Sequence, residues 1–223
     1  LIRDTNDFKR IDNGISGGYY AGKYFKQMAD LNFGNVGTKE QSFIRIFAGN
    51  YDGNGKSISY NGTFAGTTHG NNANDHTTTS NGHGDYGLFG LVTGSAVIEN
   101  LNVNAQIVFT EKTPTDCANM NAGLLCGHLD SYAKIRYCNV TGEVASKIEA
   151  SNGGGGDVGL LCGQSRGTEE YCIGTGTVTG KGWVGGLIGA QESGKIHGCS
   201  FKRSEEHTSE LQSPLIISYA VFC

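Results

Sequence analysis

The unit that decides the fold reads Gly123-Leu-Leu-Cys-Gly-His-Leu-Asp-Ser-Tyr-Ala-Lys-Ile-Arg-Tyr-Cys-Asn-Val140. A small apolar strand ends in glycine, and after a short gap a second strand starts at an isoleucine. The first half recurs with closing glycines at positions 90, 127, 163 and 189, and a copy of the second half follows each of them. Repetition at this period indicates stacked strand pairs.

The second strand of each repeat alternates apolar and polar residues, as in Leu101, Val103, Ala105 and Ile107. This period of two buries one face of the strand. A repeat this small cannot bury that face alone, so neighbouring copies must stack, with about 4.8 Å between strand layers. The sequence therefore predicts an all-β protein, a parallel β-helix (β-solenoid).

Stacking the repeats in register predicts two structural columns of interior side chains. One column contains Phe89, Cys126, Cys162 and Ile188, and the other contains Leu101, Cys138, Cys172 and Cys199. Small, soft thiols pack well in a narrow interior, so we expect buried free cysteines. Disulfides between successive coils are the alternative, because adjacent rungs bring Cα atoms to about 5 Å. The chain has no C-x-x-C pair, which argues against zinc at these cysteines or at Cys117.

Residues 1–60 form a different kind of segment. Asp4 is a good helix N-cap and is followed by Phe8 and Ile11 at a spacing of three, so we expect a short amphipathic helix that covers the open end of the stack. A strand is expected over 24–33 and a hairpin over 43–59.

The turn of that hairpin is predicted at Asp52, Gly53, Asn54 and Gly55, residue types that adopt positive φ angles readily. The same four residues resemble the start of a calcium loop. No acidic residue follows at the distance that an EF-hand requires, so the structural turn is the preferred interpretation.

Three further segments follow residues 1–60. Residues 61–85 are a polar insertion rich in Gly, Asn, Thr and His, and residues 86–202 hold the four repeats. Residues 203–223 resemble the translation of a common short-read sequencing adapter, over 203–213 and again over 217–223. We expect this tail to be an artefact that is disordered and outside the fold, and the rest to be a fragment of a longer protein.

The order of 24–33, Phe47–Ile58, Tyr86–Gly90 and Ile98–Val103 resembles the GLUG-repeat surface proteins of bacteria. These include adhesin-like proteins and the non-catalytic N-terminal regions of some immunoglobulin-A metalloproteases. The resemblance covers about residues 5–201 and implies a right-handed parallel β-helix that is secreted or attached to the cell surface. It carries over no catalytic residues, because the His-Glu-x-x-His zinc motif is absent from this sequence.

The chain departs from the family pattern in two ways. Cysteine replaces a large aliphatic residue at Cys126 and Cys162, and the third repeat has Glu169 where isoleucine is expected. A carboxylate at an interior position is costly, so we expect the third coil to be locally irregular.

The polar insertion contains the strongest candidate metal ligands. His69, His76 and His83 recur every seven residues, with Asp75 and Asp85 nearby. A loop could gather them around a divalent ion. A solvated surface loop of the same composition needs no ligand, and we favour that interpretation, with no metal and no cofactor.

Charge and hydropathy exclude two classes of partner. The formal net charge is −4, so no basic surface for nucleic acid is indicated. The sequence has no run of 18 apolar residues, so no membrane insertion is expected within it.

Acidic residues do not indicate an active site. Glycoside hydrolysis needs two carboxylates about 5 to 10 Å apart, whereas Glu99, Glu143, Asp157, Glu169 and Glu192 fall at different phases of the repeat. We therefore expect a non-enzymatic extracellular protein that acts in adhesion or ligand binding, towards a host protein or a glycan. The alternatives are a passive stalk and a β-helix polysaccharide-processing enzyme.

Overall fold

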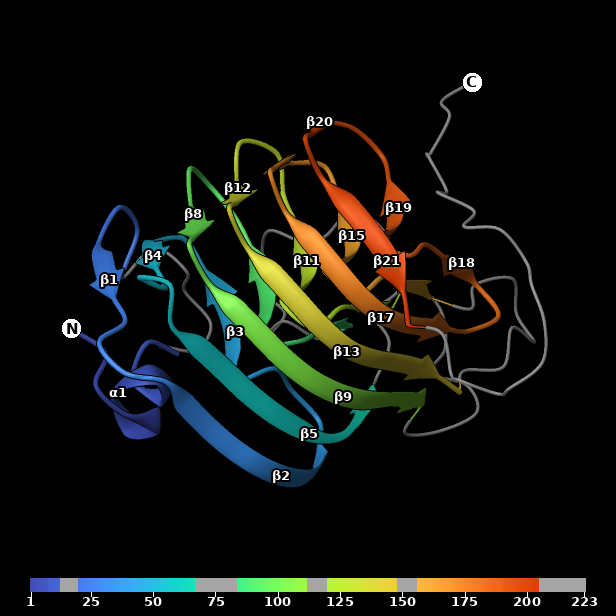
Figure 1. The fold of residues 1–223 in the computed structure, drawn as a ribbon, viewed down its shortest axis with the longest axis horizontal. Helices are drawn as coiled ribbons and strands as arrows, with labels where there is room; N and C mark the ends of the chain where they lie inside the picture. The colour runs from blue at the N-terminus through green and yellow to red at the C-terminus, as the bar shows by residue number, and fades with distance from the viewer. Residues whose placement is uncertain (13–19, 67–83, 112–119, 148–155, 205–223) are drawn as a thin grey trace.

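The structure, a computed structural model, describes residues 1–12, 20–66, 84–111, 120–147 and 156–204. Every strand in it pairs in parallel with its counterpart in the neighbouring coils, with residues in register over most of each ladder. Figure 1 shows the coils side by side in sequence order from blue to red. The predicted all-β parallel β-helix is confirmed.

Each complete coil contains four strands, one in each of four sheets. The long sheet faces the viewer in Figure 1 and has the order β2 (Leu31–Lys39), β5 (Ser57–Gly66), β9 (Asn102–Glu111), β13 (Asn139–Ser146), β17 (Ile173–Thr179) and β21 (Ser200–Arg203). A second six-stranded sheet of short strands has the order β1 (Tyr24–Lys26), β4 (Asn50–Asp52), β8 (Val97–Glu99), β12 (Lys134–Arg136), β16 (Thr168–Glu170) and β20 (Lys195–His197).

The other two sheets complete the coil. The five-stranded sheet has the order β3 (Ile44–Phe47), β7 (Phe89–Val92), β11 (Cys126–Leu129), β15 (Cys162–Ser165) and β19 (Ile188–Gln191). The four-stranded sheet has the order β6 (Asp85–Tyr86), β10 (Asn121–Ala122), β14 (Asp157–Val158) and β18 (Trp183–Val184).

The prediction of two strands per repeat is wrong, because each predicted strand is bent by a corner. In the second half of the repeat, Asn100 has a φ of 54° and separates β8 from β9. In the first half, the closing glycine does not end a strand but is its second residue. A Cβ on Gly127 would collide with the backbone of Tyr86 in the preceding coil, so only glycine fits there.

The N-terminal helix predicted as a cap is confirmed. Helix α1 (Thr5–Lys9) begins after Asp4, whose carboxylate accepts hydrogen bonds of 2.8 Å from the backbone N–H groups of Asn6 and Asp7. Its one buried residue, Phe8, makes edge contacts with three aromatic rings of the first coils: Phe33, Tyr51 and Phe89. The Phe8 ring therefore covers the interior of the stack at its N-terminal end.

The predicted hairpin over 43–59 is wrong. Strands β4 and β5 pair with their counterparts in neighbouring coils, not with each other. The turn between them contains Asn54 and Gly55 at φ values of 53° and 70°, and it is a corner of the coil. The predicted strand over 24–33 is likewise divided between β1 and the start of β2.

Two expected boundaries lie elsewhere in the structure. Strand β5 extends to Gly66, so the polar insertion assigned to 61–85 starts inside a strand. Strand β21 pairs Arg203 with Gly176, which takes the first residue of the expected tail into the long sheet. Residues 205–223 lie outside the described residues.

The third coil is regular, contrary to expectation. Glu169 keeps the register of its column, between Ile135 in one neighbouring coil and Ile196 in the other. Main-chain hydrogen bonds to the coils on both sides fix the backbone of Glu169. Its carboxyl group is therefore buried in the interior. Among the described residues, no helix has the length and apolar character needed to cross a membrane.

Candidate ligand-binding surface

One outer corner of the coils carries aromatic and polar side chains in successive layers. It joins the short-strand sheet to the long sheet, and in the four repeats its residues are Asn100, Tyr137, Tyr171 and Gly198, which we call the corner column. The main-chain amide of Tyr137 donates to the carbonyl of Glu170 at 2.9 Å, and that of Tyr171 donates to the carbonyl of His197 at 2.8 Å. The corner is therefore hydrogen-bonded from one coil to the next.

All four residues of the corner column have left-handed backbone conformations, with φ between 54° and 63°. Asparagine and glycine adopt this conformation readily, whereas for a bulky residue it is a conformational outlier that costs about 1 to 2 kcal/mol. Two tyrosines at such positions therefore indicate a role for the ring other than local backbone stability.

The two tyrosines of the corner column stack face to face on the outside of the molecule. Their ring centroids lie 5.3 Å apart and their planes differ by 2°. A Cβ on Gly198 would meet the ring of Tyr171, so the backbone of the last coil lies close to that ring. The Tyr171 ring is thus flanked by Tyr137 and by Gly198, and His197 Nε2 lies 3.1 Å from its hydroxyl.

A pocket of about 350 Å³ lies on the other side of Tyr137. It is lined by Asp52, Asn54, Gly55, Asn100, Asn102, Tyr137 and Asn139. Apart from Tyr137 and Asn139, these residues belong to the two preceding coils, so the pocket opens where the small Asn100 replaces a ring in the corner column. One ring face of Tyr137 is covered by Tyr171, and the opposite side of the residue faces the pocket.

The polar residues of the pocket hold one another in place through their amide groups. Asn139 Nδ2 donates to Asn102 Oδ1 at 2.9 Å, and Asn102 Nδ2 donates to the carbonyl of Gly55 at 2.9 Å. Asn100 Nδ2 donates to Asp52 Oδ1 at 3.1 Å. Within the described residues, no hydrogen bond uses the side-chain carbonyl oxygens of Asn100 and Asn139, which leaves two positioned acceptors in the lining.

Asp52 supplies the negative charge of the pocket. Partial burial opposes ionisation of Asp52, but hydrogen bonds from Asn100 and the Asn54 amide, with the Lys26 ammonium 3.5 Å away, hold the pKa of this carboxyl below its usual range. The carboxylate is therefore ionised at neutral pH.

Three of the four predicted turn residues, Asp52, Asn54 and Gly55, thus line this pocket. The sequence predicted the turn but not the other lining residues, Asn100, Asn102, Tyr137 and Asn139. The available signal was the residue just before each cysteine or leucine of the second interior column, which varies between Asn, Tyr and Gly.

The structure stacks both sets of column residues in register. Cys126 pairs with Phe89 on one side and with Cys162 on the other, which pairs with Ile188. In the second column, the amide of Ile173, next to Cys172, donates to the Cys138 carbonyl at 3.0 Å, and the amide of Ser200, next to Cys199, donates to the Cys172 carbonyl at 2.9 Å. All five described cysteines are free thiols, and burial raises the pKa of Cys162 well above its ordinary value. Cys117 lies outside the described residues.

The predicted metal ligands are not brought together within the described residues. His69, His76, His83 and Asp75 lie outside them. Asp85 is buried at the start of β6, where it accepts a hydrogen bond of 2.8 Å from Asn121 Nδ2. In the part of the chain that the structure describes, no group of three His, Cys, Asp or Glu side chains is arranged to hold a metal ion.

Two of the acidic residues expected to lie apart are in fact neighbours. Gln164 Nε2 donates to Asp157 Oδ2 at 3.2 Å and to Glu192 Oε1 at 2.7 Å, and Arg166 pairs with Glu192 at 2.6 Å. Burial, with the nearby Glu192 charge, raises the pKa of Asp157 to about 6. The Gln164 amide occupies the space between the two carboxylates, where a hydrolase would place its substrate.

Glu169 is the most unusual charged residue of the interior. It is fully buried, and neither carboxylate oxygen accepts a hydrogen bond within normal geometry. Burial raises the pKa of Glu169 to about 7, and the neighbouring Ser165 hydroxyl only partly offsets this. This buried carboxyl group therefore destabilises the core when it is ionised.

Comparison with known proteins agrees with the repeat architecture. The family model described as the GLUG motif matches residues 118–145, which include β10 to β13. A 72-residue segment, 32% of this chain, is 44% identical to halomucin from Haloquadratum walsbyi (strain DSM 16790 / HBSQ001), and it spans 1% of the length of that protein. No solved structure matches the chain. The motif match falls on one of the four stacked repeats, so this part of the chain is similar to the GLUG motif.

Proposed function

We propose that the chain is a ligand-binding segment of a secreted or cell-surface protein and acts in adhesion. The observation that carries this proposal is the exposed corner column, where two strained tyrosines and a polar pocket lie on the outside of a rigid stack. The corner is hydrogen-bonded from one coil to the next, and a site that is held firmly in this way favours recognition of an external partner. The GLUG motif match supports a surface location.

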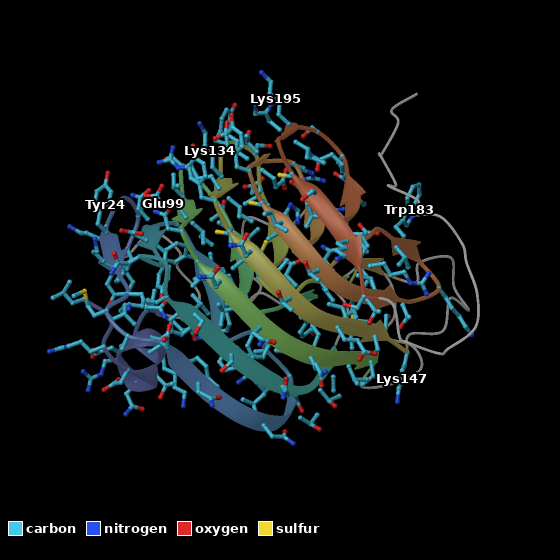
Figure 2. The ribbon with its side chains drawn as sticks, viewed as in Figure 1. Tyr24, Glu99, Lys134, Lys147, Trp183 and Lys195 are labelled. Atoms are coloured by element: carbon cyan, nitrogen blue, oxygen red, sulfur yellow. The ribbon has the colours of Figure 1, made fainter. Side chains whose placement is uncertain are left out.

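A host protein or a glycan is the expected partner. The surface of the described coils carries both signs of charge, with ion pairs such as Glu99–Arg136 at 2.7 Å on the short-strand sheet. Figure 2 shows Glu99, Lys134 and Lys195 along that sheet, which gives it no single sign. Such a surface does not favour nucleic acid or an anionic membrane.

Binding of the purified chain to immobilised extracellular-matrix proteins and mucin-type glycoproteins tests the proposal. We expect saturable binding that is lost in the double variant Tyr137→Asn, Tyr171→Asn, because asparagine keeps the left-handed backbone and removes the rings. Absence of binding to every surface would favour the alternative, a passive stalk that displays another domain.

A non-enzymatic role is part of the same proposal. Asp157 and Glu192, two neighbouring carboxylates that could act on a sugar, are bridged by Gln164, and Arg166 partly neutralises Glu192. Incubation with a polysaccharide panel is expected to release no new reducing ends. Release that disappears in Glu192→Gln would establish the β-helix polysaccharide-processing alternative.

A further inference from the structure

We propose that the pocket beside Tyr137 is a saccharide subsite that binds one neutral pyranose ring of a glycan, with the ring stacked on Tyr137. This inference rests on the proposed function and deepens it by assigning a ligand class to a defined site. Three properties of the pocket support this assignment: its aromatic wall, its acceptors and its charge.

The aromatic wall is a consequence of the register of the corner column. Tyr137 and Tyr171 stack at the spacing of successive coils, and the next position in the same direction is occupied by the much smaller Asn100. A flat ligand that enters the pocket would continue the stack by one layer. A pyranose presents a face of C–H groups, which carry a partial positive charge and pack favourably on the negative face of an aromatic ring.

The polar lining fits the edge of a sugar. Hydroxyl groups both donate and accept, and the pocket offers the carbonyl oxygens of Asn100 and Asn139 together with the Asp52 carboxylate. The hydrogen bonds from Asn139 to Asn102 and from Asn100 to Asp52 fix these groups before a ligand arrives, which lowers the entropic cost of binding. The volume of about 350 Å³ lies within the range of small-molecule sites.

The charge of the pocket selects against acidic sugars. Asp52 is ionised, and Lys26 is its one cationic partner among the described ion pairs. A sialic acid or a sulfated sugar would bring a second negative charge next to this carboxylate. A neutral hexose has no such penalty, so we expect neutral oligosaccharides to bind better than their sialylated or sulfated counterparts.

The test measures binding of the 223-residue chain to a panel of neutral, sialylated and sulfated oligosaccharides, with isothermal titration of the neutral compounds that bind. We expect Tyr137→Asn to weaken binding at least tenfold, which corresponds to about 1.4 kcal/mol. Tyr137→Phe is expected to keep the affinity within about twofold, because the ring face remains.

Tyr132→Asn is the matched control. Tyr132 lies in the same repeat, also has a left-handed backbone with φ of 69°, and is 85% exposed, but it is not part of the pocket lining. We expect this variant to bind like the unmodified chain. Thermal unfolding of each variant checks that the coil stack is intact.

Two results would overturn the saccharide proposal. One is neutral-sugar binding that is unaffected by Tyr137→Asn. The other is binding to deglycosylated host proteins with no binding to any sugar, which would leave the adhesion proposal standing. Absence of both kinds of binding would contradict both proposals.

Discussion

The two ends of the coil stack differ in how their interior side chains are covered. At the N-terminal end, helix α1 places the buried Phe8 ring among three aromatic rings of the first coils. In the last described coil, Ile196 is 36% exposed and Val184 is 40% exposed, whereas Ile135 and Val158, at the same positions in earlier coils, are fully buried. Figure 2 shows Trp183 at the far side of the molecule from Tyr24.

Stability in a solenoid therefore depends on position in the stack. Each coil is stabilised by its neighbours, so a coil with one packed neighbour is stabilised less than a coil with two. The interior also changes along the axis, because the column that begins with Ile44 and Phe89 continues with the smaller Cys126 and Cys162. We therefore expect equivalent substitutions to cost less near the last described coil.

The largest effect is expected for Phe8→Ala. Removing a fully buried ring that covers the N-terminal end of the stack should lower the free energy of unfolding by about 3 to 5 kcal/mol. Ile196→Ala is the control at the other end, and because Ile196 is partly exposed we expect a loss of about 1 kcal/mol or less. Chemical denaturation of both variants measures the contrast, and equal losses would contradict the capping role of α1.

Glu169 provides a pH-dependent test of the interior. Its pKa is about 7 in the folded protein and 4.5 ordinarily, so the folded state binds the proton more tightly than the unfolded state. The resulting stability is fully present below pH 4.5 and is lost as the pH rises through 7, by an amount on the order of 3 kcal/mol.

Glu169→Ile isolates this contribution, because it restores the isoleucine of the neighbouring coils and cannot titrate. Asp157, whose pKa is raised to about 6, contributes in the same direction in both proteins and cancels in the difference. We expect the variant to be more stable than the unmodified chain at pH 8 and to differ less at pH 4. An equal difference at both pH values would show that Glu169 does not titrate in the core.

The closing glycines allow the same substitution to be compared at two positions. A Cβ at Gly127 or at Gly189 would collide with the backbone of the preceding coil. Gly127→Ala lies between two packed coils and should cost about 3 kcal/mol, whereas the last described coil can shift and Gly189→Ala should cost about 1 kcal/mol. Thermal unfolding measures the order of the two losses, and the reverse order would contradict the positional account.

The smallest effect is expected for removal of residues 205–223. These residues resemble translated adapter sequence, so we expect the melting temperature to be unchanged or slightly higher without them. A large decrease in the melting temperature would mean that they contribute to the fold.

The sequence predicted the repeat and the interior but not the corners. Period-two alternation in Leu101, Val103, Ala105 and Ile107 indicated the buried face, and all four are buried in β9 or at its start. The corner between β8 and β9 and its counterpart between β12 and β13 were missed because Asn100 and Tyr137 turn the chain without glycine or proline, and a bulky residue at positive φ is not expected from sequence.

The candidate site could not be predicted because it depends on register. The pocket exists only where Asn100 stacks next to Tyr137 in the adjacent coil, 37 positions along the chain. The contact of Asp157 and Glu192 with Gln164 was missed for the same reason, since loops of different length displace equivalent residues along the sequence.

Native-state hydrogen exchange measures whether stability is graded along the parallel stack. The main-chain amides of Asn102, Asn139, Ile173 and Ser200 occupy equivalent positions, and each donates to the preceding coil over 2.9 to 3.1 Å. Their hydrogen bonds are alike, so differences in exchange report local stability. We predict that Asn139 exchanges more than tenfold more slowly than Ser200, with Ile173 between them. Equal protection at all four amides, or strongest protection at Ser200, would contradict the account.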